Sequence, residues 1–413
     1  MKKYMTDPNL FDYLLKNQTY VMYTPEVIRS SNLINLFEAV LKQFLDRGDR
    51  LNAIALEKVF VYAFAWAIGG LFETEERDRF HKFLESLGAP LPSISSQKMS
   101  VDKETVFDYY IRPETKDWAL WEAEEWVQPK RISFSQLLIP TIDSTRSEYI
   151  ITSIAGLADM RNEIRKERGF KSTLVVGGVG TAKTSCALMY STKLDTSKML
   201  FKSVNFSSAT TPRMFQDAVD GEIEKKQGKL FGPPGTCKLT VFFDDMSMPF
   251  VNEWNDQITL EIMRQLIELE GYYFLNKENR GDFKNVSNLQ FLGAMNHPGG
   301  GRNDIPNRIK RFFFIFNMTS PSVRSIENIY GRILTLLFNP KKYSQEIIAV
   351  KDMLTDATIS LWDIVRRKLL PTPTKFHYIF NIRELSRVFQ GICGVAQNLE
   401  FKVIQNASNA QAK

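Results

Sequence analysis

The sequence contains few of the residues that bind zinc or form disulfides. Among 413 residues there are three cysteines and three histidines. Cys186, Cys237 and Cys393 are far apart, and none has the C-x-x-C spacing of a zinc site or a redox motif. We therefore expect no Cys/His metal site, and we expect three reduced thiols in a reducing compartment.

Long hydrophobic runs and a secretion signal are missing too. The longest apolar run, residues 59–72, contains a Gly-Gly pair and is shorter than the roughly 18 residues that a membrane-spanning helix needs. The N-terminal residues lack the apolar core of a signal peptide. The net charge is only +6, and no long basic block suggests a nucleic-acid partner. These absences predict a cytoplasmic protein that binds neither membranes nor nucleic acid.

The most informative segment is a glycine-rich loop that follows a short apolar run. Residues 172–176 read Ser-Thr-Leu-Val-Val, residues 177–184 read Gly-Gly-Val-Gly-Thr-Ala-Lys-Thr, and a helical pattern comes next. A strand, a glycine loop and a helix in this order are typical of a phosphate-binding loop, because backbone N–H groups and the helix N-terminus then face one phosphate. The alternative is a glycine-rich turn that binds nothing.

Two side chains and the loop backbone are the predicted phosphate contacts. We expect Lys183 to contact the β- and γ-phosphates and the Thr184 hydroxyl to bind Mg²⁺. The expected backbone contacts are Gly178, Val179, Gly180, Thr181 and Ala182. Ala182 stands where a second glycine is usual, so we expect little cost if its φ is negative and strain if its φ is positive.

Strands and helices alternate after this loop. Further strands are predicted at 201–206, 239–243, 289–295 and 312–316, and helices at 144–166, 214–226 and 258–269. This alternation predicts an α/β fold with a parallel five-stranded sheet and helices on both faces.

The two ends of the chain have helical patterns instead. Residues 10–87 predict an N-terminal helical bundle, and residues beyond Pro321 predict C-terminal helices, the last at 382–397. The proline- and serine-rich residues 88–103 resemble a linker. The aromatic stretch at 107–129 favours a strand pair or turn over a surface that stacks bases. We expect domains at 1–90, 91–320 and 321–413.

Acidic and amide residues end two of the predicted strands. In a parallel sheet the carboxyl ends of the strands share one edge, so Asp244 is expected beside Thr184, holding the Mg²⁺ shell. Asp245 is expected to polarise the attacking water, and Asn296 to orient that water or contact the γ-phosphate. Alternatively, these residues only cap turns. Hydrolases of this kind usually have glutamate at position 245, and the shorter aspartate could cost on the order of a hundredfold in rate.

Three arginines have two possible roles. Arg308 and Arg311 precede the last predicted strand, where either could reach a phosphate bound to a neighbouring subunit as an arginine finger, or form a surface salt bridge. Arg383 begins the last helix and could contact the γ-phosphate, or remain exposed.

Taken together, these residues resemble the AAA+ ATPases, and more narrowly the third AAA+ module of dynein heavy chains. The features that carry the resemblance are residues 138–146, the Gly-Thr-Ala-Lys-Thr form of the loop, residues 204–211 and 244–249, and the Pro-Gly-Gly-Gly-Arg-Asn run within 297–304. Residues 245–249 and 252–257 look most like the axonemal outer-arm type. The resemblance covers roughly residues 106–400, and residues 1–90 look like the helical small subdomain of the second module.

The resemblance implies a site for ATP or ADP with Mg²⁺. It assigns the adenine pocket to Ile139 and Pro140, Walker A to Lys183 and Thr184, Walker B to Asp244 and Asp245, sensor 1 to Asn296, sensor 2 to Arg383, and the finger for the preceding module to Arg308 or Arg311.

In this family the module is regulatory and gates communication between the main motor ATPase and microtubule release. The resemblance thus implies neighbouring AAA+ modules as partners, microtubule contact only through other parts of the motor, and a ciliary or flagellar axoneme as the location. Slow or partner-dependent hydrolysis fits the aspartate at 245. One alternative is a structural ring segment with permanently bound ADP or no nucleotide. A self-contained ATPase is disfavoured, because such a chain would be expected to begin with its own complete module.

Overall fold

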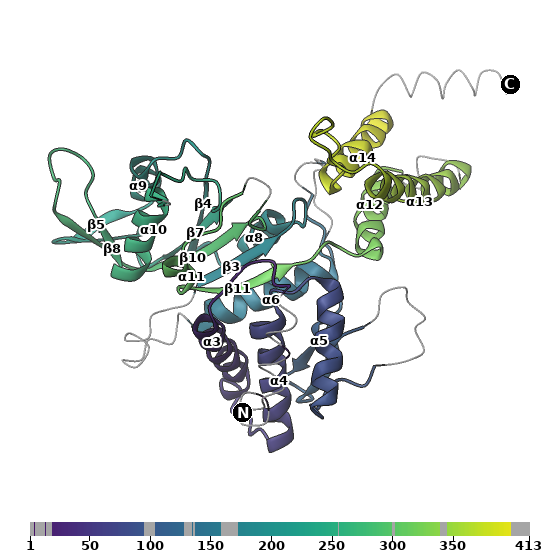
Figure 1. Cartoon of the computed structure of the whole chain (residues 1–413), viewed down its shortest axis with the longest axis horizontal. Helices are drawn as coiled ribbons and strands as arrows, with labels where there is room; N and C mark the ends of the chain where they lie inside the picture. The colour runs from purple at the N-terminus through teal and green to yellow at the C-terminus, as the bar shows by residue number, and fades with distance from the viewer. Residues whose placement is uncertain are drawn as a thin grey trace. The chain divides into compact units, whose positions relative to one another are not determined.

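The computed structural model describes residues 4, 13, 19–94, 104–127, 134, 137–157, 172–254, 256–299, 302–338 and 345–397 (Figure 1). The chain divides into two compact units. The first comprises residues 1–121, 146–178 and 182–319, and the second comprises residues 122–145, 179–181 and 320–413.

The first unit is built on a parallel five-stranded sheet, as predicted. Its order is β11 (Phe313–Met318), β3 (Ser172–Gly177), β10 (Leu289–Met295), β7 (Lys238–Asp244) and β4 (Met199–Asn205). Every residue of β3 and β11 is buried, which is typical of parallel strands covered on both faces.

Two hydrophobic cores lie on opposite faces of this sheet. The side chains of Val175, Phe314 and Phe316 join the core formed with α3 (Glu26–Leu45), α4 (Ala53–Gly69), α6 (Ile142–Leu157) and α8 (Lys183–Thr192). The alternate residues Leu174 and Phe313 join the other core, formed with α9 (Pro212–Asp220), α10 (Ile258–Leu269) and α11 (Asn307–Lys310). Successive residues of a strand point to opposite faces, so the apolar runs supply both cores.

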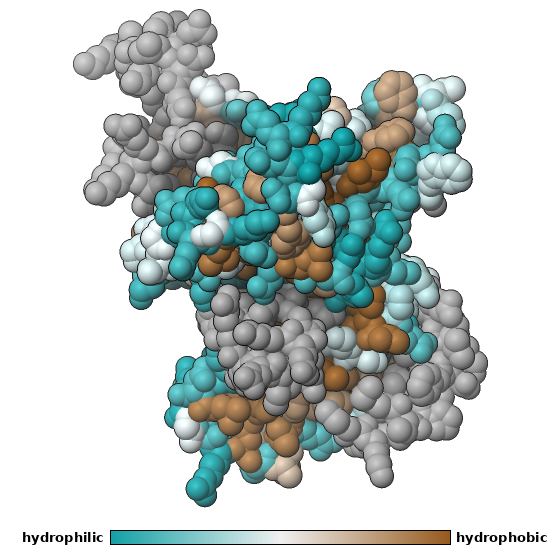
Figure 2. All heavy atoms as spheres, turned by 90° about the vertical axis from the view of Figure 1, so that its left-hand side faces the viewer, coloured by the Kyte–Doolittle hydropathy of each residue, from teal (hydrophilic) through white to brown (hydrophobic). Residues whose placement is uncertain are grey.

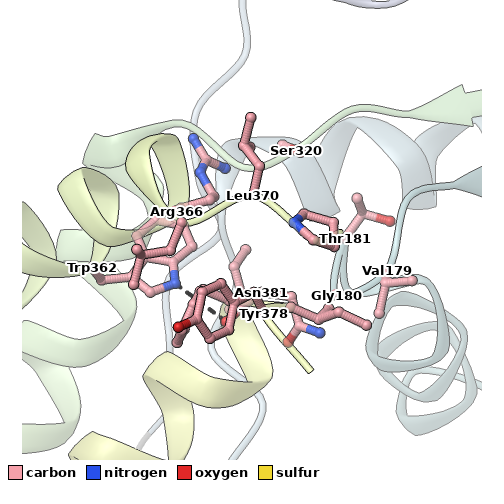
Figure 3. Close-up of a pocket in the computed structure, with 14 residues that line it drawn as sticks. Val179, Gly180, Thr181, Ser320, Trp362, Arg366, Leu370, Tyr378 and Asn381 are labelled. Atoms are coloured by element: carbon pink, nitrogen blue, oxygen red, sulfur yellow. Dashed lines mark hydrogen bonds between the residues drawn. The ribbon is translucent and has the colours of Figure 1, made fainter. Parts of the chain in front are cut away.

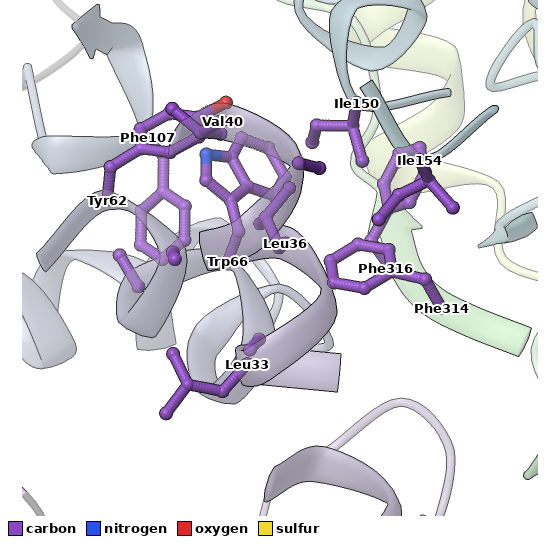
Figure 4. Close-up of a cluster of buried hydrophobic side chains, with 14 of the residues drawn as sticks. Leu33, Leu36, Val40, Tyr62, Trp66, Phe107, Ile150, Ile154, Phe314 and Phe316 are labelled. Carbon is purple, nitrogen blue, oxygen red and sulfur yellow. The ribbon is translucent and has the colours of Figure 1, made fainter. Parts of the chain in front are cut away.

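The N-terminal part of the first unit is helical, as predicted. It contains α3 (Glu26–Leu45), α4 (Ala53–Gly69) and α5 (Thr74–Ser86), followed by a hairpin of β1 (Tyr109–Arg112) and β2 (Asp117–Leu120). The hairpin confirms the strand pair expected from the aromatic stretch. Figure 4 shows side chains from α3, α4, α6 and β11 converging around Trp66, whose ring centroid is 5.3 Å from that of Phe107 and 6.1 Å from that of Phe316. The helices and the sheet therefore share one core.

A second, four-stranded sheet was not predicted. It has the order β5 (Glu224–Gln227), β6 (Leu230–Gly232), β9 (Phe283–Val286), β8 (Gly271–Tyr273), and Figure 1 shows it near α9 and α10. The helix predicted at 214–226 is wrong in its second half, because α9 ends at Asp220 and the chain enters β5. All four residues of β5 are exposed and polar, so no apolar period marks it.

A buried polar cluster fixes this second sheet to α9. The Tyr272 hydroxyl donates to Asp220 Oδ1 at 2.5 Å, and Lys284 Nζ donates to the same oxygen at 2.6 Å. Lys284 Nζ also lies 4.1 Å from the ring centroid of Phe231. The lysine charge is thus paired and stacked inside the sheet.

The second unit is helical where it is described. It contains α12 (Val323–Leu337), α13 (Gln345–Lys368) and α14 (Ile382–Gln397), and the bounds of α14 are those predicted. Its core packs Ile139 against Tyr330, Leu334 and Phe389. Segment 137–141 forms no strand. All three cysteines are free thiols, and no helix in the described parts of either unit is long and apolar enough to cross a bilayer.

Hydrophobic side chains on the surface are mostly scattered. Figure 2 shows hydrophilic side chains over much of one face, with hydrophobic ones gathered toward its lower end, the level of α3 and α4 in Figure 1. Exposed apolar residues of these two helices are Val27, Ile34, Leu45, Ile54 and Leu56.

Candidate functional site

The side chains expected to hold Mg²⁺ meet at the carboxyl edge of the sheet. Thr184 lies in the first turn of α8 and Asp244 ends β7. The Thr184 hydroxyl donates a hydrogen bond to Asp244 Oδ2 at 2.8 Å. A hydroxyl and a carboxylate are the kinds of oxygen ligand that Mg²⁺ prefers, directly or through water. This pair therefore fits a magnesium site.

Asn296 connects the rest of the predicted site. It follows β10, and its Nδ2 donates to Asp245 Oδ1 at 2.9 Å. Lys183 Nζ donates to Asn296 Oδ1 at 3.2 Å, and the N–H of Asp245 donates to Asp244 Oδ1 at 3.0 Å. Five of the polar residues predicted in this unit thus form one connected network, which does not include Arg308 and Arg311.

The Lys183 ammonium is held close to the loop it follows. Besides Asn296, it donates to the carbonyl oxygens of Gly177 at 2.9 Å and Gly178 at 2.7 Å. Lys183 is 8% exposed, and these contacts keep its charge partnered in a buried place. A phosphate group would compete with them as a charged, stronger acceptor.

The electrostatics of the edge favour a cation. Burial raises the pKa of Asp244 above its ordinary range, and the negative charge of Asp245 raises it further, whereas the hydrogen bond from Thr184 lowers it. The neighbouring carboxylate thus disfavours the charged form of Asp244 unless a positive group offsets it. A divalent cation would supply that offset.

The loop contains a strained alanine. Ala182 has φ 64° and ψ 25° and precedes the first residue of α8. This left-handed conformation costs a non-glycine residue about 1–2 kcal/mol. Gly180, with φ 83°, takes a similar conformation without that cost. Of the two possibilities left open by the sequence, the structure shows the strained one.

We expect Ala182→Gly to stabilise the first unit by about 0.5–1 kcal/mol, because glycine relieves the positive φ but loses more chain entropy on folding. Urea unfolding measures the change. Ala187→Gly is the matched control, since Ala187 lies inside α8 and is buried. There the same substitution should destabilise by about 1 kcal/mol or more. A loss of stability in both variants would contradict the assignment of strain to Ala182.

Arg308 and Arg311 form surface salt bridges with or near α10. Arg308 Nη2 lies 2.8 Å from Asp256 Oδ1, and its Nε lies 3.3 Å from Glu261 Oε2. Arg311 pairs with Glu268. Both arginine side chains are about half exposed, at 47% and 49%. The salt-bridge role is therefore present in this chain, and the arginine-finger role stays a prediction.

The second unit contains the remaining predicted residues. Ile139 is buried in its core, Pro140 is half-buried, and Arg383 is exposed in the first turn of α14. The N–H of Arg383 donates to Asn381 Oδ1 at 2.7 Å. Their contacts with nucleotide stay predictions.

A pocket of about 280 Å³ lies in this unit (Figure 3). The loop residues Val179, Gly180 and Thr181 line it together with side chains from 362–382, among them Trp362 and Tyr378. Trp362 Nε1 donates to the Asn381 carbonyl at 3.3 Å, shown as a dashed line. The lining residues beyond 320 belong to no sequence motif and were therefore not predicted as part of a site. The aromatic residues just before α14 were the one available signal.

Comparison with known families decides the identity of the fold. Residues 126–321 match the P-loop containing dynein motor region, and residues 2–123 match the dynein heavy chain AAA lid domain. The chain belongs to the dynein heavy-chain family. Residues 354–402 of this dynein module match the AAA+ lid domain. The predicted AAA+ fold, with its flanking helical parts, is confirmed.

Its relatives are axonemal dyneins. The module is 39% identical over 377 residues to the gamma chain of the flagellar outer arm of Chlamydomonas reinhardtii, covering 90% of this chain and 8% of the relative. It is 40% identical over 366 residues to axonemal heavy chain 8 of Homo sapiens, covering 87% and 8%. Against axonemal heavy chain 5 of Rattus norvegicus it is 36% identical over 399 residues, covering 95% and 11%. The chain thus spans about a tenth of these relatives or less.

Proposed function

We propose that this dynein module binds ATP or ADP together with Mg²⁺, hydrolyses ATP slowly, and passes its nucleotide state to the neighbouring AAA+ modules of the same heavy chain. The observation that supports this proposal is a single hydrogen-bond network at the edge of the sheet. It joins Lys183, Thr184, Asp244, Asp245 and Asn296. In the axoneme of a cilium or flagellum, such a module would regulate a motor that reaches the microtubule through other parts of the chain.

Three residues of the network bind the nucleotide or its metal in this proposal. Thr184 and Asp244 would hold Mg²⁺, whose positive charge would favour phosphate oxygens at this edge of the sheet, and Lys183 would exchange a loop carbonyl for a phosphate oxygen. Backbone N–H groups of residues 178–182 face the phosphates. Ile139 and Pro140 contact the adenine and Arg383 senses the γ-phosphate, as the family resemblance implies.

The domain assignment belongs to the same proposal. Residues 1–90 form the helical small subdomain of the preceding module, residues 91–320 the large subdomain with the phosphate loop, and residues 321–413 the small subdomain. Arg308 or Arg311 serves the nucleotide of the preceding module and must then leave its salt bridge with Asp256, Glu261 or Glu268.

Slow hydrolysis follows from Asp245. Its side chain is one methylene shorter than the usual glutamate, and its carboxylate accepts the Asn296 amide at 2.9 Å. A carboxylate that is set back and already bonded is poorly placed to accept a proton from water. A structural ring segment is the second candidate, which the strain at Ala182 and the loop-bound Lys183 favour.

Equilibrium binding of labelled ATP and ADP with Mg²⁺ tests the proposal. Nucleotide-stripped wild type should bind saturably, and Lys183→Ala should weaken binding at least about 100-fold by removing the charged phosphate contact. Lys198→Ala is the matched control, because Lys198 is an 80% exposed lysine paired with Asp195. It should bind like wild type. If stripped wild type binds neither nucleotide, the structural segment replaces the regulatory module.

A further inference from the structure

The residue after Asn296 is anchored on a different part of the first unit. His297 Nε2 lies 2.9 Å from Asn317 Oδ1 in β11. Asn317 Nδ2 donates at 3.2 Å to both the Phe72 carbonyl and Glu73 Oε1, which settles the orientation of the amide. An amide oxygen only accepts, so His297 Nε2 carries the hydrogen and donates. His297 therefore reaches the turn between α4 and α5 through a single side chain.

Asn317 is a buried junction between that turn and the sheet. It is 1% exposed, and its N–H donates to the Gly70 carbonyl at 2.8 Å. Its own carbonyl accepts from Arg77 Nη2 at 2.7 Å. In the sheet it lies opposite Val176, one residue before β3 ends and the phosphate loop begins. Each of these buried hydrogen bonds is costly to lose, so Asn317 holds the turn, the sheet and His297 together.

Two consecutive residues thus have different attachments. The Asn296 side chain bonds to Lys183 and Asp245, whereas the His297 side chain bonds to Asn317 and lies 3.6 Å from Glu73 Oε1. Any phosphate contact that displaces Lys183 or Asn296 from its present bond acts on the backbone that carries His297.

We infer that His297 is a positioning residue, which holds Asn296 in the network and couples nucleotide contact there to the turn formed by residues 70–73. This inference rests on the proposed function. The turn joins two helices of the segment 1–90, assigned above to the preceding module. His297 therefore directs the signal of this nucleotide site toward that module, through its hydrogen bond to Asn317 and its contact with Glu73.

Hydrogen–deuterium exchange on the full chain, with and without ATP·Mg²⁺, tests the coupling. In wild type, nucleotide should change the exchange rate of amides in residues 70–77 by at least about fivefold. His297→Ala should bind nucleotide but lose this response. His297→Gln should restore it, because the glutamine amide can donate in place of Nε2. A purely packing role for His297 would alter exchange without nucleotide and leave the response to nucleotide intact.

A further variant and the nucleotide-binding measurement distinguish a failure of the coupling from a failure of the proposed function. Glu73→Ala removes the carboxylate that accepts from Asn317, in the turn between α4 and α5. Because the Glu73 side chain is 48% exposed, this variant should fold and can replace His297→Ala if that variant does not. It should also reduce the response. Wild type that binds ATP without any change at residues 70–77 overturns the coupling and leaves the proposed function standing. A response that persists in His297→Ala and Glu73→Ala overturns the coupling too. Wild type that binds no nucleotide overturns both.

Discussion

Arg77→Ala should destabilise the first unit by about 3–5 kcal/mol, because it removes three buried hydrogen bonds from a charged donor, and such bonds contribute about 1.5–3 kcal/mol each. Arg77 is 4% exposed, and its guanidinium donates to the carbonyls of Phe72, Gly70 and Asn317 at 3.2, 3.3 and 2.7 Å. Alanine removes the donor to the Asn317 carbonyl, and an unsatisfied buried acceptor costs about 1–3 kcal/mol. The carbonyls of Gly70 and Phe72 lose one donor each and keep their hydrogen bonds from Asn317. The guanidinium also lies 5.2 Å from the ring of Trp66, so its stacking is lost as well.

Urea unfolding followed by tryptophan fluorescence measures this effect. Lys82→Ala is the control, because Lys82 lies on the same helix, is 61% exposed and pairs with Asp78 one turn away, whose side chain is 28% exposed. An exposed pair of this kind contributes about 1 kcal/mol or less. Equal losses in the two variants would show that the junction with β11 does not hold the helices to the sheet.

Asp244→Asn should remove most of the effect of Mg²⁺ on nucleotide binding. In wild type we expect Mg²⁺ to strengthen ATP binding, and in the variant we expect the metal affinity to fall about 10- to 100-fold, because the amide has no charge and holds Mg²⁺ poorly. The fold should not be weakened by the loss of charge, since burial already raises the pKa of Asp244 and disfavours its charged form. Titration of ATP at several Mg²⁺ concentrations measures the change.

Asp256→Asn provides the comparison for Asp244. Asp256 is 51% exposed and pairs with Arg308, outside the network around Asn296. This variant should keep the Mg²⁺ dependence of wild type. If Asp244→Asn keeps it as well, Asp244 is not part of the metal site, and its bond to Thr184 serves only to cap the end of β7.

The central sheet and the polar network could be predicted because both follow from local rules. The strands around Val175 and Phe314 are apolar runs that end in turn signals, and parallel strands bring their carboxyl ends to one edge. From that rule, Asp244 was predicted to lie beside Thr184. In the structure the Thr184 hydroxyl donates to the Asp244 carboxylate at 2.8 Å. The bond between Lys183 and Asn296 spans 113 residues but follows from the same sheet edge.

Other features depend on contacts that no local pattern records. β5 reads Glu-Lys-Lys-Gln and exists because it pairs with β6, so its strand character comes from tertiary pairing. The bond from Arg77 to Asn317 joins residues 240 positions apart. The conformation of Ala182 was open because alanine tolerates either sign of φ at different cost. Backbone geometry, not residue identity, decided it.

The exchange of bound nucleotide tests most directly whether this dynein module is a switchable regulatory site. Protein loaded with labelled ADP would be mixed with excess unlabelled ATP·Mg²⁺, and the label remaining on the protein would be followed with time. A regulatory module should release all of its label within minutes, while Lys183→Ala should retain none at the outset. Label that stays bound for hours, or wild type that takes up none, would contradict the account and identify a structural segment of the ring.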